Sequence, residues 1–134
     1  MNQEIKAQWI KDLRSGAFPQ GHGELVSDNG DHLSYCCLGV LCHQAHAAKV
    51  LDDYEWEEIQ ESGMLDDSAV LPAAVRHWAG LQEDDPSIPE LSPCTTLSEL
   101  NDGGCRGLDL TPIIGEGNTH ATFEQIADII EKYM

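Results

Sequence analysis

The chain has 134 residues, of which 24 are acidic and 7 are Lys or Arg, so its formal net charge at pH 7 is −17. This length is typical of one domain with its own hydrophobic core, and we expect residues 1–134 to form a single globular domain. No run of about 18 apolar residues is present and the N-terminal segment is charged and helix-patterned, so we expect a cytoplasmic protein without a membrane span or secretory leader.

The first predicted elements are a helix and a β-hairpin. The positions that indicate the helix are the capping Asn2, the apolar Ile5, Trp9 and Leu13, and the terminating Gly16. Two short β-like runs follow, at Glu24–Val26 and His32–Tyr35. They flank a polar segment with an Asn-Gly pair, which is typical of a hairpin turn.

A second helix is expected from Cys37 to Lys49. Its apolar positions recur at spacings of three and four, and they are Leu38, Leu41, Cys42 and Ala45. Gly39 inside this helix indicates a close approach by another part of the chain. Short strands are expected at Tyr54–Trp56 and Met64–Leu65, because apolar and charged residues alternate there.

The second half contains three more helical segments and two loops. Leu71–Gly80 has Pro at its start and Gly at its end, and Thr96 can cap a helical turn at Leu97–Leu100. Residues 82–94 and 105–121 have the composition of loops. A capping box begins the last helix at Thr122. The pattern predicts a small α+β domain of about four helices with a hairpin and a few short strands, and a helical bundle with an attached hairpin is the near alternative.

Several motifs of the chain combine in one pattern. They are the hairpin leading into Tyr35-Cys-Cys-Leu-Gly-Val-Leu-Cys42, the segment Leu71-Pro72…Trp78-Ala-Gly-Leu81, and Leu97…Asp102 followed by Thr122-Phe…Asp128. Together with the opening helix, this pattern resembles a family of small proteins carried by bacteriophages and prophages. The loop 105–121 is longer than that pattern leads us to expect. The resemblance implies an accessory or host-takeover role, and it carries no catalytic residue over to this chain.

Acidic residues are concentrated in one part of the chain. Between Asp52 and Asp102 there are 14 carboxylates and one cation, Arg76. Such a surface repels nucleic acid and attracts cations or basic protein surfaces, so we expect a basic host-protein surface as the partner. The expected partner-binding residues are Asp52, Asp53, Glu55, Trp56, Glu57, Glu58, Glu61, Asp66 and Asp67. A trait of solubility, or of a salt-adapted host, is the other interpretation of the charge.

The five cysteines suggest an enzyme as an alternative. In a reducing cytosol they are expected to be free and mostly buried thiols. Cys36 and Cys37 lie at a predicted helix start, where the helix dipole stabilises a thiolate. A thiolate there would be the nucleophile of a cysteine hydrolase, although an acidic environment raises the pKa of a thiol and opposes its ionisation. The histidines that can supply a base are His77, His120 and His22, and the side chains that can orient it are Asn101 and Asp102.

A zinc site is the second chemical alternative. Cys42 and His46 are four residues apart and His43 lies between them, so a zinc site with Cys36, Cys37 or His32 is conceivable. Cys42 falls on the predicted core face, however, whereas the two histidines fall on a polar flank. The preferred hypothesis is therefore a binding protein without cofactor or metal.

Overall fold

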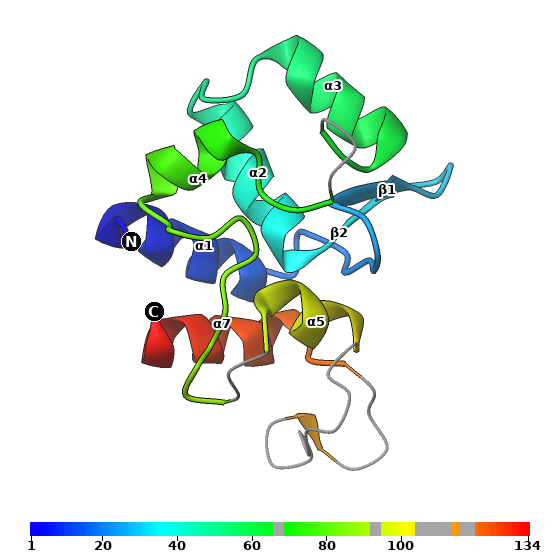
Figure 1. The fold of residues 1–134 in the computed structure, drawn as a ribbon. Coiled ribbons are helices and arrows are strands. Elements are labelled where there is room, and N and C mark those ends of the chain that lie inside the picture. The colour runs from blue at the N-terminus through cyan, green and yellow to red at the C-terminus, as the bar shows by residue number, and fades with distance from the viewer. Residues whose placement is uncertain (66–68, 92–94, 104–113, 116–119) are drawn as a thin grey trace.

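The computed structural model describes residues 1–65, 69–91, 95–103, 114–115 and 120–134, and within them the fold is α+β (Figure 1). The elements with described bounds are α1 (Gln3–Arg14), β1 (Val26–Asp28), β2 (Leu33–Tyr35), α2 (Cys37–Ala47), α3 (Asp53–Ser62), α4 (Ala73–Ala79), α5 (Leu97–Asp102) and α7 (Phe123–Tyr133). Among the helices described, none has the length and apolar character needed to cross a lipid bilayer.

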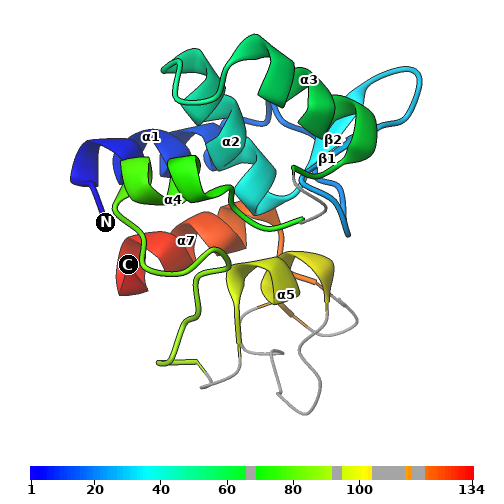
Figure 2. The ribbon, with the colours of Figure 1, turned by 45° about the horizontal axis from the view of Figure 1, so that its top comes forward.

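Helix α2 is the centre of the molecule, with α1, α3, α4 and α5 packed around it (Figures 1 and 2). Every residue from Cys37 to Cys42 is buried, and so is Ala45. A helix that is apolar on all sides is typical of a core position, because each side must face another element rather than water. The predicted helix and its inward positions Leu38, Leu41 and Cys42 are confirmed.

The two ends of the chain form one side of the domain. Helices α1 and α7 pack along each other, and both termini lie close together in Figures 1 and 2. Asn2 caps α1 by accepting hydrogen bonds from the backbone of Glu4 and Ile5, as its position predicts. The capping box predicted for the last helix is also present, between Thr122 and Gln125.

The hairpin is fixed against the start of α2. Its two strands are antiparallel, with Val26 opposite Tyr35. The carbonyl of Leu25, just before β1, accepts a hydrogen bond of 3.1 Å from the Cys36 N–H. Gly39 lies against the same carbonyl, and a Cβ atom at position 39 would be only 1.8 Å from that oxygen. The close approach predicted from Gly39 is therefore confirmed, and its partner is a backbone group.

Residues 53–62 correct the sequence prediction, because they form helix α3 where short strands were expected. Asp52 accepts a hydrogen bond from the Glu55 N–H, and the Glu55 side chain accepts one from the Asp52 N–H. This capping box fixes the first turn, while Trp56 and Ile59 are buried three residues apart. Of the second strand predicted nearby, Leu65 alone forms an isolated β-bridge.

We predict that Gly39→Ala lowers the free energy of unfolding by at least about 3 kcal/mol. Helix propensity alone would favour alanine by about 0.5–1 kcal/mol, so the sign of the change tests whether the Leu25 carbonyl is in contact. Urea unfolding measures the effect. Gly16→Ala is the control, because Gly16 has a φ of +76° but a Cβ added there would meet no atom within 4 Å, and about 1–2 kcal/mol is expected. A Gly39→Ala protein as stable as the parent would contradict the packing.

Candidate functional site: an acidic face and a buried amide network

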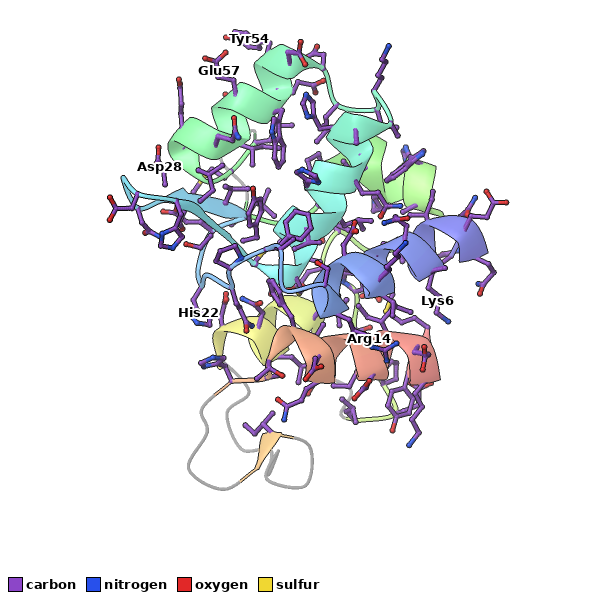
Figure 3. The ribbon with its side chains drawn as sticks, turned by 180° about the vertical axis from the view of Figure 1, so that it is seen from behind. Lys6, Arg14, His22, Asp28, Tyr54 and Glu57 are labelled. Carbon is purple, nitrogen blue, oxygen red and sulfur yellow. The ribbon has the colours of Figure 1, made fainter. Side chains whose placement is uncertain are left out.

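The exposed side of α3 is a strongly charged surface. We call it the acidic face and define it by five exposed carboxylates together with an exposed tyrosine. These residues are Asp52, Asp53, Tyr54, Glu57, Glu58 and Glu61. Positions 53, 57 and 61 follow one another at one helical turn, so their carboxylates form a row along the outside of the helix. Asp28, at the hairpin, and Glu57 lie on the same side of the molecule in Figure 3.

Two features of the acidic face lower the stability of helix α3. Carboxylates four residues apart repel one another, as in the pairs Asp53–Glu57 and Glu57–Glu61, and each such pair costs roughly 0.2–0.5 kcal/mol. The last turn of α3 contains no basic residue, although a cation is favoured there by the helix dipole. In the described residues, the one ion pair formed by these side chains joins Asp53 to His46. The carboxylates of Glu57, Glu58 and Glu61 are thus left without an ion pair among the described residues, at a cost in stability.

Tyr54 is the exposed aromatic residue of this face, and Trp56 is not. The Tyr54 side chain is 79% exposed, and among the described residues no other large hydrophobic side chain is exposed. Trp56, which the sequence offers as a partner-binding residue, is buried and stacks on the ring of His46 at 5.4 Å. Burial makes Trp56 unavailable to a partner. The segment is helical, so Tyr54 and Trp56 point to different sides rather than to the same side of a strand.

The remaining predicted partner-binding residues differ in position. Glu55 is half-buried and its carboxylate is engaged in the capping box of α3. Asp66 and Asp67 lie outside the described residues. The acidic face is therefore formed by α3 and its capping residue.

Four of the described Lys and Arg side chains belong to α1 and α7. Lys6, Lys11 and Arg14 project from α1, and Lys132 is at the end of α7. Figure 3 shows Lys6 and Arg14 well away from Tyr54 and Glu57. Arg14 is engaged there with Asp128 at 2.6 Å and Glu131 at 3.1 Å, so it joins α1 to α7. These four cations leave the acidic face unpaired, and in the chain the nearest described cation to it is Lys49, three residues before Asp52, which also forms no ion pair with it.

The thiols at the start of α2 are buried rather than presented to solvent. Cys36 is the capping residue of α2, and its Sγ accepts a hydrogen bond of 3.3 Å from the Gly39 N–H. This contact favours the thiolate, but burial outweighs it and raises the pKa of Cys36 to about 12. Burial also raises the pKa of Cys37 and Cys42. His77, the base considered for Cys36 and Cys37, is exposed on α4 and accepts a hydrogen bond from Arg76.

The three residues considered for zinc have separate environments. Cys42 is fully buried in the core. His43 lies edge-on to the rings of Phe18 and Trp56, and burial lowers its pKa. His46 binds Asp53 through Nε2 at 2.8 Å. No group of three or more metal-ligating side chains is found in the part of the chain that the structure describes.

A buried amide network lies beside the start of α2. The side chain of Asn101 is fully buried, and its Oδ1 accepts hydrogen bonds from Gln20 Nε2 at 3.0 Å and the Cys37 N–H at 3.2 Å. Its Nδ2 donates to the Gly21 carbonyl at 2.9 Å and to Asp102 Oδ1 at 2.7 Å. All four hydrogen-bonding positions of the amide are thus used, which is what a buried polar group requires.

This network also positions a pair of histidines. The Asn101 carbonyl accepts a hydrogen bond of 2.8 Å from His22 Nδ1, and Asp102 Oδ1 lies 3.9 Å from the same nitrogen. The rings of His22 and His120 contact each other with centroids 4.4 Å apart. The structure therefore brings together four of the residues that the sequence offers as base or orienting groups, namely His22, His120, Asn101 and Asp102. They come from three distant segments, so no spacing in the sequence could indicate their proximity.

One of the comparisons with known proteins gives a match. A family model described as a domain of unknown function, DUF8296, matches residues 1–134. The chain belongs to the DUF8296 family. No curated protein and no solved structure matches this DUF8296 chain. The family match therefore covers the whole chain and assigns no activity.

We predict that the thiols of Cys36, Cys37 and Cys42 react slowly with iodoacetamide in the native protein. At pH 8, a pKa of about 12 leaves roughly one thiolate in ten thousand at Cys36, and burial blocks access as well. Because the pKa is raised, labelling should rise with pH through pH 9 and above. Mass spectrometry of a Cys94→Ser/Cys105→Ser variant, with and without urea, isolates these three positions. Rapid labelling of Cys36 at neutral pH would restore the hydrolase hypothesis.

We predict that Asn101→Ala lowers the free energy of unfolding by about 3–5 kcal/mol, because the buried Cys37 N–H and Gly21 carbonyl lose their partner. Thermal or urea unfolding measures the loss. Gln8→Ala is the control, since Gln8 is an exposed amide on α1 that binds only Asp12 in the described structure, and a change within about 0.5 kcal/mol is expected. Equal effects of the two substitutions would contradict the role given to the network.

Proposed function

We propose that this protein is a non-enzymatic binding protein that docks its acidic face on a basic surface of another protein. The observation that carries the proposal is Tyr54, which is 79% exposed among carboxylates that no described Lys or Arg neutralises. An exposed aromatic ring supplies the apolar anchor of an interface, and the surrounding charges supply orientation and fast association. The family resemblance supports a phage or prophage accessory protein acting in the host cell cytoplasm.

The chemistry of the acidic face favours one class of partner. A nucleic-acid-binding protein has Lys and Arg side chains arranged to meet a row of phosphates. The carboxylates at positions 53, 57 and 61 offer a row of negative charges on a rigid helix, so they can occupy such a surface in place of phosphates. A host nucleic-acid-binding or defence protein is therefore the partner that we propose, and its inhibition is the expected consequence. Direct binding of nucleic acid is disfavoured by the net charge of −17.

The cost of the acidic face supports a role beyond solubility. Charges spread over a surface improve solubility without repelling one another at helical spacing. Here the like charges follow one another along α3 and reach its C-terminal turn, where the helix dipole opposes them. Local violations of this kind are typical of functional surfaces, where binding offsets the loss of stability.

The proposal is tested by capture from bacterial lysate with the tagged protein and two variants of its acidic face. We expect Glu57→Lys/Glu61→Lys to weaken binding of the captured partner at least about tenfold, and Tyr54→Ala to weaken it by roughly thirtyfold. Capture should decline between about 0.1 M and 0.5 M salt, since exposed charges are screened. Added duplex DNA should compete if the partner surface is one that binds nucleic acid.

The control carries the same change of charge elsewhere. Glu4→Lys/Glu124→Lys also replaces two carboxylates by two ammonium groups, but in the first turns of α1 and α7 rather than on the acidic face. It should retain the partner. Equal losses in both double variants would reduce the effect to net charge, and a partner that tolerates both Tyr54→Ala and the acidic-face double variant would refute the proposed surface.

A further inference from the structure

A pair of histidines lies outside the acidic face and has no part in the proposed function. His22 comes from the segment between α1 and β1, and His120 lies two residues before Thr122, the capping residue of α7. Their rings meet at an angle of 62°, with centroids 4.4 Å apart. Figure 3 shows His22 below the hairpin, away from Tyr54 and Glu57.

The hydrogen bond of His22 fixes which of its nitrogens can act as a ligand. The Asn101 carbonyl, 2.8 Å from Nδ1, has no proton to donate, so the proton of the bond is on His22 Nδ1. In the neutral ring, Nε2 therefore bears the lone pair. A histidine that binds a metal typically donates its second ring N–H to a backbone carbonyl or carboxylate in this way, which orients the ring and raises its basicity. Asp102 adds a carboxylate near the same Nδ1.

The second histidine is held by the same buried network. The N–H of Ala121, the residue after His120, donates to the Leu100 carbonyl at 2.9 Å. The Ala121 carbonyl accepts a hydrogen bond of 2.9 Å from Gln20 Nε2, which also donates to Asn101 Oδ1. Both imidazoles therefore belong to segments that are hydrogen-bonded around one fully buried side chain. Preorganisation of this kind reduces the entropy lost when a ligand joins the two segments.

We propose that His22 and His120 bind one borderline divalent metal ion of the Zn²⁺ or Ni²⁺ class, with water completing its coordination shell. Imidazole nitrogen is a ligand that these ions prefer, whereas Mg²⁺ and Ca²⁺ prefer oxygen. With metal–nitrogen distances of about 2.0–2.1 Å, two imidazoles on adjacent positions of one ion have ring centres roughly 4.5–5.5 Å apart. The observed 4.4 Å requires only a small outward movement, and the His22 side chain is 45% exposed and so has room to make it.

The bound ion would clamp the segment before the hairpin to the start of α7. A third protein ligand is absent from the described residues, so the site differs from a closed structural zinc centre. Asp102 acts here through hydrogen bonds to Gly23 and Asn101 rather than as a ligand. The high negative charge of the chain raises the local concentration of any cation, and only the two imidazoles select the borderline class.

The test compares thermal unfolding of metal-free protein with Zn²⁺ and with Mg²⁺ at equal concentration. We expect Zn²⁺ to raise the midpoint at pH 7 and Mg²⁺ to leave it unchanged, because imidazole nitrogen is a ligand of the borderline ions and a poor one for Mg²⁺. His22→Gln and His120→Gln should each weaken Zn²⁺ binding in calorimetric titration at least about tenfold. His32→Gln is the matched control, since His32 is exposed on the hairpin and should leave binding unchanged.

A second measurement needs no variant. In nitrogen-15 spectra of the histidine rings, one equivalent of Zn²⁺ should move the Nε2 resonance of His22 while its Nδ1 keeps a bound proton. An equal rise in the unfolding midpoint with Mg²⁺ would show that Zn²⁺ acts only by neutralising charge, and this would contradict the proposal. Zn²⁺ binding that is kept in both His22→Gln and His120→Gln, or an unmoved His22 resonance, would overturn the proposal. Loss in His46→Gln alone would place the ion between α2 and α3 instead.

Discussion

The fold depends on one buried amide, the side chain of Asn101. It joins the segment before the hairpin, the first turn of α2 and the end of α5, through hydrogen bonds to Gln20, Gly21, Cys37 and Asp102. In a protein interior a satisfied amide contributes modestly to stability, but an orphaned partner costs one to several kcal/mol, so the network selects one arrangement of these segments against all others. The packing of Gly39 on the Leu25 carbonyl then fixes the hairpin against the same end of α2.

The rigid centre and the charged periphery have separate roles. Trp56 and Ile59 attach α3 to the core, and the opposite side of the helix is left to carboxylates and Tyr54. Because core packing supplies the stability of α3, the helix tolerates repulsion between its like charges. This is why a surface unfavourable to an isolated helix can persist here, where it is available to a basic partner.

Burial decides the chemistry of the cysteines. A thiol at a helix start ordinarily becomes more acidic, because free N–H groups stabilise the thiolate. At Cys36 the Gly39 N–H provides that stabilisation, yet the loss of hydration raises its pKa to about 12. The sulfur atoms thus serve as small apolar groups around α2. In the same region, the more accessible ionisable side chains are those of His22 and His120, which the Asn101 network positions.

The sequence by itself determined the α+β class, the hairpin, the caps at Asn2 and Thr122, and the close approach at Gly39. These features depend on residues near one another in the chain, where spacing and capping chemistry act directly. It misassigned α3, because charged and apolar residues alternate at Tyr54–Trp56 and the capping box that begins at Asp52 was not recognised. Only the tertiary structure decided that Tyr54 is exposed and Trp56 buried, and that His22, Asn101 and His120 meet. Contacts between residues about 80–100 positions apart depend on how helices pack, and that packing leaves no periodic trace in the sequence.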